Sequence, residues 1–468
     1  MQRILQRSTN RRGVMKATAA AMAAGLPLSS ALRIEAMAQA STPTADIAGT
    51  SLKILQWSHF IPAYDTWFDA FAQAWGEAND VDVTVDHINT ADIPAALAGE
   101  LSAGEGHDLI EHISSLAQYE KSMVPMNDLI AEASARHGDQ LVMCAANGYN
   151  PSTDTFYGFV HGYAADPGDY RKSLWEAVEL PDGPSTWDEL LAGGSKIRSE
   201  QGVQLGIGMS NEIDSRMAAQ TLIWAFGGAI QDENENVTVN SPEVIAAVEY
   251  MANLFKETMT EEVFGWTAAS NNQLMIAGQA SYILNSISAY RTAQGAQPEV
   301  AADVFFHEPL VGPGGQELAL AHGHAVFNYQ IPSYSPNVAT AQEFILYLVD
   351  NYKDASYESQ LYNFPAWPSI VPDLTAEGGW LDVDPFGSDP VDKLKPLKGA
   401  QDWTVNLGWP GPANAAIGEI FNLPTIPNMM ARAATGLATA EESVAQAEKE
   451  INEIFEKWRS EGLVGGGS

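Results

Sequence analysis

Apolar and polar residues follow two different periods along the chain, and the order of these periods predicts an α/β fold. Residues 53–56 read as a short apolar strand, and residues 81–85 alternate as a half-buried strand does. Between them, residues 64–75 carry apolar side chains at helical spacing. A helix over 92–103 and a strand over 107–110 follow. This order is typical of a parallel sheet with crossover helices, in which ligands bind at the carboxyl ends of the strands.

The same alternation continues to the end of the chain. A helix is expected to begin after Ser185 or Thr186, because either residue can cap it and acidic residues fill its first turn. Residues 374–398 are acidic and rich in Pro and Gly, which indicates a surface excursion. Further strands are predicted over 156–163 and 325–327, and further helices over 216–226, 242–258, 338–351 and 441–458.

The first forty residues have the pattern of an export signal. They begin with several basic residues, continue through an Ala-rich apolar stretch and end in small residues at Ala40. The pair Arg11 and Arg12 resembles the twin-arginine export motif. A soluble periplasmic protein, cut near Ala40, is therefore expected. The alternative is a buried amphipathic helix, whose apolar face Arg33 and Glu35 would interrupt.

Charge narrows the classes of partner. The 468 residues include 24 basic and 59 acidic side chains, a net charge of −35. The first forty residues hold six of the basic and one of the acidic side chains, so the remaining chain carries −40. Such a charge argues against binding to nucleic acid or to an anionic membrane, since both need Lys and Arg.

The remaining composition fits a globular protein that needs no cofactor. With 46% hydrophobic residues, the chain can bury a large core. No later stretch approaches the roughly 18 apolar residues of a transmembrane helix. Cys144 is the single cysteine, so neither an internal disulfide nor a cysteine-based metal site can form.

Several local patterns follow one another in an order that resembles the extracellular solute-binding proteins (family 1, carbohydrate type) of ABC importers, which include the maltodextrin-binding proteins. Each pattern alone is weak, but together they span about 400 residues behind an export signal. The patterns are Pro-Ser-Thr-Trp-Asp-Glu-Leu at 184–190, Leu-Ile-Trp-Ala-Phe-Gly-Gly at 222–228, Ser-Pro at 241–242, Met-Ile-Ala-Gly-Gln-Ala at 275–280, Ala-Thr-Gly at 434–436 and Glu-Glu-Ser-Val at 441–444.

The resemblance implies an α/β, two-lobed periplasmic binding protein of type II-like fold, with discontinuous lobes joined by a hinge. The export signal occupies 1–40, and a flexible tail is expected at 461–468. Lobe one would comprise 47–158 plus 308–355, and lobe two 159–307 plus 356–460. The resemblance also implies a monomer that closes on a small-molecule ligand and then docks on a membrane permease. Residues 159–163, at the expected lobe crossing, lack the acidic residue of maltodextrin binders, so their ligand does not carry over.

A sugar site needs flat aromatic surfaces and fixed hydrogen-bonding groups. Trp57 is expected in a loop after the first strand, because Trp-Ser-His is too polar for a core strand. Its alternative is a core position, and the alternative for Ser114 and Ser115 is a helix cap. From strand ends, aromatic loops and the resemblance, the expected ligand-binding residues are Trp57, Ser58, His59, Ser114, Ser115, His161, Tyr163, Trp224, Asn285, Ser286, His322, Gly323, Trp367 and Trp409.

Two features leave the ligand's chemistry open. His322 and His324 alternate before a strand, but two imidazoles without a third ligand are weak evidence for a metal, and none is expected. Arg216 is one of few cations in lobe two, and it would favour an anionic ligand if it faces the cleft. Otherwise the acidic surface favours a neutral sugar.

The prediction is therefore a periplasmic protein that captures a mono- to oligosaccharide for an ABC transporter permease. Alternatives are a binder of a glycerol phosphodiester or polyol, and a ligand-sensing subunit. The chain has no Gly-x-Ser-x-Gly, His-Glu-x-x-His or P-loop motif, so no enzyme is expected. Counting carboxylates does not exclude a glycosidase pair, because acidic residues are abundant.

Overall fold

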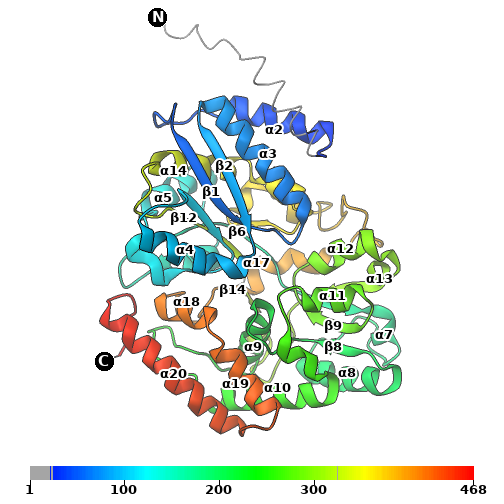
Figure 1. Ribbon diagram of the computed structural model, residues 1–468. Helices are drawn as coiled ribbons and strands as arrows, with labels where there is room; N and C mark the ends of the chain where they lie inside the picture. The colour runs from blue at the N-terminus through cyan, green and yellow to red at the C-terminus, as the bar shows by residue number, and fades with distance from the viewer. Residues whose placement is uncertain (1–21, 23–24, 324, 468) are drawn as a thin grey trace, which may run out of the picture.

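Two β-sheets organise the protein, and the chain passes between them more than once. The computed structural model describes residues 22, 25–323 and 325–467 (Figure 1). The larger sheet has the strand order β13-β6-β12-β3-β1-β2. Its strands are β1 (Ser51–Trp57), β2 (Asp82–Ile88), β3 (Leu109–His112), β6 (Phe159–Tyr163), β12 (Val326–Gln330) and β13 (Phe364–Pro365). Strands β1, β2 and β3 are parallel, as the sequence predicts, whereas β12 runs antiparallel to both β3 and β6.

The smaller sheet has the order β10-β7-β9-β8. Its strands are β7 (Gly168–Arg171), β8 (Gln204–Gly206), β9 (Ala280–Leu284) and β10 (Val304–His307). Two further pairs are β4 (Tyr149–Asn150) with β5 (Thr155–Phe156), and β11 (Ala321–His322) with β14 (Thr404–Val405). We call the part built on the larger sheet lobe one and the part built on the smaller sheet lobe two.

Helices cover both sheets (Figure 1). Those of lobe one are α2 (Leu28–Ala40), α3 (Pro62–Asn79), α4 (Ile93–Ala103), α5 (Asn127–His137), α6 (Val142–Ala146), α14 (Val338–Asp350) and α15 (Tyr352–Glu358). Those of lobe two are α7 (Lys172–Glu176), α8 (Trp187–Gln201), α9 (Ile213–Ala225), α10 (Pro242–Thr258), α11 (Ser270–Ile276), α12 (Ser288–Ala296) and α13 (Pro298–Asp303). None of the described helices is long and apolar enough to cross a membrane.

The C-terminal third adds α16 (Pro372–Thr375), α17 (Ala400–Trp403), α18 (Ala415–Asn422), α19 (Thr425–Ala434) and α20 (Ala440–Ser460). Short 3-10 helices are η1 (Thr90–Asp92), η2 (Ala117–Ser122), η3 (Glu261–Gly265), η4 (Gln316–Leu318), η5 (Pro368–Ile370) and η6 (Lys395–Gly399). Helix α20 begins with a capping box between Thr439 and Glu442. It buries Val444, Ala447 and Phe455 against α10, α18 and α19, as its apolar spacing predicts.

The lobe boundaries differ from the expected ones at two strands. Both β6 and β13 belong to the larger sheet, although residues 159–307 and 356–460 were assigned to lobe two. The reason is the pairing of β6 with β12, which keeps the chain in lobe one until Tyr163. The chain therefore crosses to lobe two between β6 and β7. The segment expected as a flexible tail packs against the protein, with Leu463 and Val464 buried.

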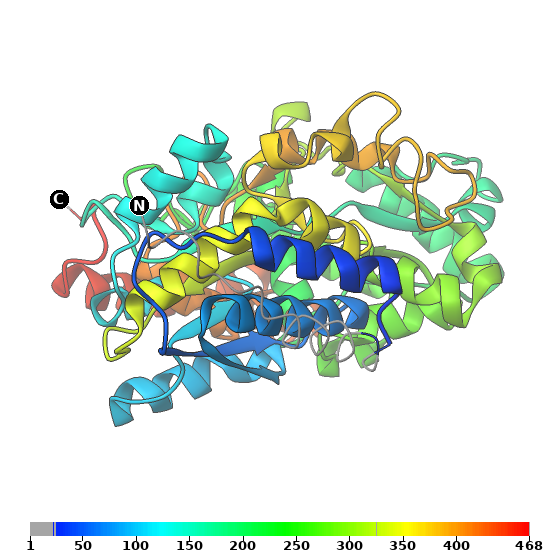
Figure 2. The same ribbon diagram turned by 90° about the horizontal axis from the view of Figure 1, so that it is seen from above.

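Helix α2 covers part of lobe one within the predicted export signal. It lies along α3 (Figure 2). Its side chains Ala31, Ile34 and Ala38 are buried. Arg33 does not interrupt this apolar face, because its guanidinium pairs with Glu358 of α15 at 2.9 Å. Arg11 and Arg12 lie outside the described residues.

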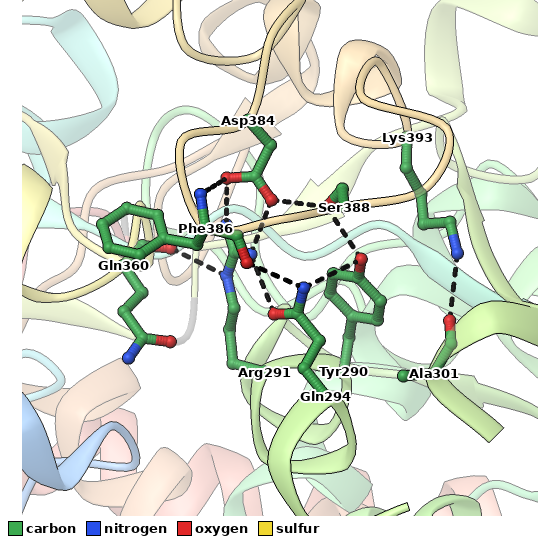
Figure 3. Close-up of polar contacts among 9 residues, drawn as sticks. All are labelled: Tyr290, Arg291, Gln294, Ala301, Gln360, Asp384, Phe386, Ser388 and Lys393. Atoms are coloured by element: carbon green, nitrogen blue, oxygen red, sulfur yellow. Dashed lines mark hydrogen bonds and ion pairs between the residues drawn. The ribbon is translucent and has the colours of Figure 1, made fainter. Parts of the chain in front are cut away.

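Residues 374–398, which we call the strap, are fastened to lobe two by a buried arginine (Figure 3). Two nitrogens of Arg291 in α12 donate to the two carboxylate oxygens of Asp384 at 2.7 and 3.0 Å. The Arg291 Nε also donates to the carbonyl of Gln360 at 2.9 Å. The side chains of Arg291 and Asp384 are 1% and 0% exposed. One arginine thus joins α12, the segment before β13 and the strap.

Contacts of two more side chains, Tyr290 and Lys393, hold the strap at the same place. The Tyr290 hydroxyl donates to Ser388 Oγ at 2.7 Å. Lys393 Nζ donates to the carbonyl of Ala301 at 3.0 Å and lies 4.3 Å from the centre of the Phe305 ring. Burial lowers the pKa of the Lys393 amine to about 8. The predicted surface excursion is therefore anchored by buried polar contacts.

We expect Asp384→Ala to lower the free energy of unfolding by about 3–5 kcal/mol, because it leaves the Arg291 charge buried without a partner. Burial raises the pKa of Asp384, but the hydrogen bonds and charge of Arg291 lower it more, so its pKa lies below 3.8. The stabilisation is thus present above about pH 4 and is lost as the pH falls through the lower folded-state pKa. Denaturant unfolding at several pH values measures both effects.

The matched control is Asp373→Ala, which removes the exposed partner of Lys353. An exposed ion pair contributes about 1 kcal/mol or less. Equal losses in the two variants, or a loss for Asp384→Ala that is the same at pH 3 and pH 7, would contradict the assignment.

Candidate functional site

A cleft of about 650 Å³ lies between the two lobes. Its lobe-one wall follows the ends of β1, β2 and β3, and its lobe-two wall follows the start of α9 and the segment between η3 and α11. The end of α18 closes one side. The lining residues are Ser58, Phe60, Asn89, Thr90, Ala91, Asp92, Pro94, Ala95, His112, Asn211, Glu212, Ile213, Arg216, Trp266, Thr267, Ala268, Ala269, Phe421 and Asn422.

The register of the parallel strands accounts for the lobe-one wall. Trp57 pairs with Ile88, so β1 and β2 end side by side, and Ser58 and Asn89 follow them. His112 is the last residue of β3. The Asn89 side chain accepts a hydrogen bond from the backbone N–H of Ala91 at 2.9 Å, which fixes the turn into η1. The carboxyl ends of the parallel strands thus form this wall, as expected for such a sheet.

Glu212 caps the helix that forms the lobe-two wall. Its carboxylate accepts from the backbone N–H of Asp214 at 2.7 Å and of Ser215 at 2.5 Å, and also from the Ser215 hydroxyl. Burial, followed by the charge of Asp214, raises the pKa of Glu212 to about 7, although these hydrogen bonds oppose the shift. The capping contacts hold this carboxylate at the N-terminus of α9.

Arg216 lies one turn further along α9. Its guanidinium carbon is 5.5 Å from the centre of the Phe421 ring, and one of its nitrogens donates to the side-chain oxygen of Asn211. Burial lowers the pKa of Arg216 to about 10, and the charge of Glu212 opposes this, so the group stays cationic at neutral pH.

His112 contributes a neutral ring. Its Nδ1 lies 2.9 Å from Ser114 Oγ and accepts from the backbone N–H of Ser114 at 3.2 Å. Burial lowers the pKa of His112 to about 4, against the opposing contacts of the Ser114 and Thr90 backbones. The other rings that line the cleft are those of Phe60 and Trp266, which are partly exposed, and of Phe421, which is buried.

This set of groups suits a small polyhydroxylated solute. The aromatic rings offer apolar surfaces, and amides, hydroxyls and charged groups from both lobes offer donors and acceptors. The described residues contain no group of three or more His, Cys, Asp or Glu that could hold a metal ion. His324, the second member of the proposed His pair, lies outside the described residues.

Of the residues expected to bind ligand, Ser58 lines the cleft and two neighbours support its wall from behind. The predicted loop position of Trp57 is wrong, because Trp57 is the last residue of β1 and is 1% exposed. Its ring lies 5.4 Å from that of Phe60. His59 is also buried, because Asn363 bonds its Nε2 at 2.9 Å and Ile61 donates to its Nδ1.

The two serines and the crossing-strand residues lie inside lobe one. Ser114 orients His112, as described above, and Ser115 Oγ lies 2.6 Å from the Tyr157 hydroxyl. His161 bonds Glu111 at 2.6 Å with both side chains buried. The side chain of Tyr163 is buried at 2% exposure, so none of these residues lines the cleft.

Trp224, His322 and Trp409 form one aromatic group beside the cleft. The Trp224 ring stacks on that of His322 at 5.3 Å, and its Nε1 donates to the carbonyl of Trp409 at 3.0 Å. His322 lines a small pocket of about 20 Å³ that shares Arg216 and Phe421 with the cleft. The group therefore backs the lobe-two wall.

The remaining expected residues are also packed. Asn285 donates to Asn272, and Ser286 is 1% exposed. Gly323 donates its N–H to the carbonyl of Val405 at 2.9 Å. The Trp367 ring lies 5.4 Å from that of Phe159 at 0% exposure.

Sequence reasoning missed most of the cleft lining. Asn89 and Thr90 could have been found from their place after the second parallel strand. Trp266 follows a 3-10 helix, and Phe421 belongs to a helix that no pattern predicted. Arg216 was singled out only as a cation whose orientation was open.

Comparison with known proteins identifies the fold. The family model described as bacterial extracellular solute-binding protein matches residues 66–379. A probable ABC transporter-binding protein of Deinococcus radiodurans is 23% identical over 38% of this chain. That match covers 44% of the relative, so the chain spans less than half the length of this protein.

Solved structures align over most of the chain. T. maritima MalE3 with bound maltose has a TM-score of 0.72 and 18% identity, covering 86% of this chain and 100% of that one. A sugar transporter from Arthrobacter chlorophenolicus A6 with laminaribiose has a TM-score of 0.71 and 16% identity, covering 86% and 99%. A solute-binding protein from Agrobacterium radiobacter K84 with ribitol has 0.69 and 17%, covering 88% and 100%. These likenesses confirm the predicted two-lobed α/β fold.

We expect Trp57 and Trp266 to contribute different amounts to the stability of the protein. Trp57→Ala should lower the free energy of unfolding by about 3–5 kcal/mol, because it leaves a cavity in lobe one. Trp266→Ala should cost about 1 kcal/mol, because its ring is partly exposed. Denaturant unfolding of both variants checks this, and a smaller loss for Trp57→Ala than for Trp266→Ala would contradict it.

Proposed function

The chain belongs to the bacterial extracellular solute-binding proteins, and from this membership we propose that it captures a carbohydrate of one to several sugar units for an ABC importer. The ligand occupies the cleft between the lobes, and the loaded protein docks as a monomer on the membrane permease. The observation that supports this most is the cleft lining, in which aromatic rings and hydrogen-bonding groups come from both lobes.

Each side of the cleft offers a different part of the proposed contact. Phe60 and Trp266 provide apolar surfaces for the C–H faces of a sugar ring. Asn89 and Ser58 on lobe one, and Asn211 on lobe two, provide partners for hydroxyl groups. The structures named above that contain maltose and laminaribiose support a sugar as the ligand, and the ribitol complex supports a polyol as the second candidate.

The proposed mechanism is reversible capture. An open form binds the solute on one lobe, and the other lobe closes over it. Only contacts that both lobes make with the solute favour the closed form, because a ligand shifts an equilibrium by its difference in affinity for the two states. The family is one of binding proteins, so no turnover of the solute is expected.

A thermal-shift screen with maltose, laminaribiose, tagatose and ribitol tests this function. A true ligand at 100 times its Kd should stabilise the protein by about 2.7 kcal/mol, without any product in the mixture. Trp266→Ala should weaken binding of that ligand by about 1–3 kcal/mol, measured by calorimetry.

The control is Trp380→Ala, which changes a partly exposed tryptophan on the strap beside Tyr357. Its affinity should equal that of the unmodified protein. Hydrolysed sugar in the mixture, or equal affinity losses in both tryptophan variants, would count against a binding protein with this cleft.

We further propose export to the periplasm with cleavage near Ala40. The family description as extracellular supports export. The alternative is a mature chain that keeps residues 28–40, because cleavage at Ala40 would remove Ala31 and Ile34, which are buried in a helix that contacts α3. The mass of the exported protein therefore decides between the two.

We expect that mass to correspond to a chain starting at Ser41. Replacing Arg11 and Arg12 together by Lys should leave the full-length precursor unexported, because the twin-arginine pathway reads that pair. A mature chain that begins before Leu28 would contradict the cleavage site and leave the export route standing.

A further inference from the structure

The cleft lining contains three charged side chains. Asp92 lies on lobe one, and Glu212 and Arg216 lie on lobe two. His112, the other titratable group that lines the cleft, has a pKa lowered by burial to about 4 and is neutral at pH 7. Arg216 is therefore the one cation among the described lining residues.

Arg216 forms no ion pair with an acidic side chain in the described part of the chain. Among the described residues, no carboxylate oxygen lies within 4.0 Å of its guanidinium nitrogens, and its contacts are the Asn211 amide oxygen and the Phe421 ring. Its Nε is buried and has no hydrogen-bond partner among the residues that the structure describes. At least one donor of the fork is thus left for a group that the described chain does not supply.

Arg216 differs from the other described arginines in its hydrogen-bond partners. Every other described arginine donates to a carboxylate or to a backbone carbonyl: Arg33 to Glu358, Arg136 to Asp350, Arg171 to Asp303, Arg198 to Lys256, Arg291 to Asp384, Arg432 to Ser443 and Arg459 to Glu235. The chain has 59 acidic residues for 24 basic ones. A shortage of acids therefore does not explain the missing partner.

Glu212 is the nearest candidate on the same helix, but it is committed elsewhere. It stands one turn before Arg216, the spacing at which an acid and an arginine often pair. Its carboxylate instead accepts the backbone N–H groups of Asp214 and Ser215 and the Ser215 hydroxyl. The capping contacts thus hold the Glu212 carboxylate, and its charge acts on Arg216 without a direct ion pair.

Closure of the lobes would remove the rest of the guanidinium from water. A buried arginine needs charge-assisted hydrogen bonds, and a planar anionic group accepts two of them in parallel from the guanidinium fork. A neutral hydroxyl accepts one weaker bond. The site therefore matches an anion better than a hydroxyl at this position.

We propose that the solute carries one anionic group, a carboxylate or a phosphodiester, on a hydroxyl-rich frame, and that Arg216 binds this group. The proposal rests on the proposed function and names the class of its ligand. Phe421 holds the guanidinium by stacking, while the aromatic rings and amides of the cleft contact the neutral part of the solute.

Matched pairs of solutes test the proposal. Calorimetry compares D-galacturonate with D-galactose, digalacturonate with α-1,4-galactobiose, and glycerophosphoglycerol with diglycerol. We expect the acidic member of one pair to bind at least 10-fold more tightly than its neutral partner, and the pair concerned distinguishes a carboxylate from a phosphodiester.

Three arginine variants complete the test. Arg216→Gln should lose about 10- to 100-fold in affinity for the acidic solute, and Arg216→Lys should lose less, because it keeps the charge without the fork. Arg198→Gln is the control, since Arg198 donates to the backbone of Lys256 outside the cleft. Melting temperatures show whether each variant is folded. If Arg216→Gln does not fold, the affinity of Arg216→Lys is compared with that of the unmodified protein instead.

The outcomes separate the two proposals. If a neutral sugar binds as tightly as its acidic partner, or if Arg216→Gln and Arg198→Gln have equal effects, the anionic ligand is excluded and the sugar-binding function stands. If no sugar, polyol or phosphodiester binds, both proposals fall. If the acidic solute binds and is cleaved, the binding function falls while the role of Arg216 stands.

Discussion

The parallel pairing of β1 with β2 and β3 is the constraint on which the site depends. The register that places Trp57 beside Ile88 ends two strands at the same edge of the sheet. A shift of one residue would turn every side chain to the opposite face. Ser58 and Asn89 would then no longer lie on one wall. The cleft is thus a consequence of strand register in lobe one, against which lobe two places the start of α9.

Lobe two depends on a different kind of interaction, contacts between segments far apart in the sequence. Arg291 joins α12 to the strap through Asp384, 93 residues away, and to Gln360 before β13. Such a buried pair contributes little net stability compared with an apolar pair, but it fits one arrangement of the chain. Arg291 therefore ties the segment before β13, a strand of lobe one, and the strap to α12 of lobe two.

The sequence allowed the elements to be predicted better than the site. Periodicity located α10 and α14 to within a residue, because a buried helix face repeats along the chain. Periodicity carries no information on partners distant in sequence. The polarity of Ser58 and His59 suggested a loop around Trp57, yet His59 is buried because Asn363, 304 residues later, bonds it. Phe421 reaches the cleft through the packing of α18 on η2, which no local pattern encodes.

The proposed charge of the ligand also depends more on the groups in the cleft than on the net charge of the chain. A net charge of −35 favours a neutral ligand when it is treated as one field over the whole molecule. In physiological salt, however, exposed charges are screened beyond about 8 Å, so most of the acidic surface acts weakly inside the cleft. The groups that a solute meets there are Asp92, Glu212 and Arg216. Because Glu212 is held by the helix cap, the Arg216 guanidinium, which has no ion pair among the described residues, is the strongest local feature. The proposed charge of the ligand therefore rests on these few residues and not on the composition of the chain.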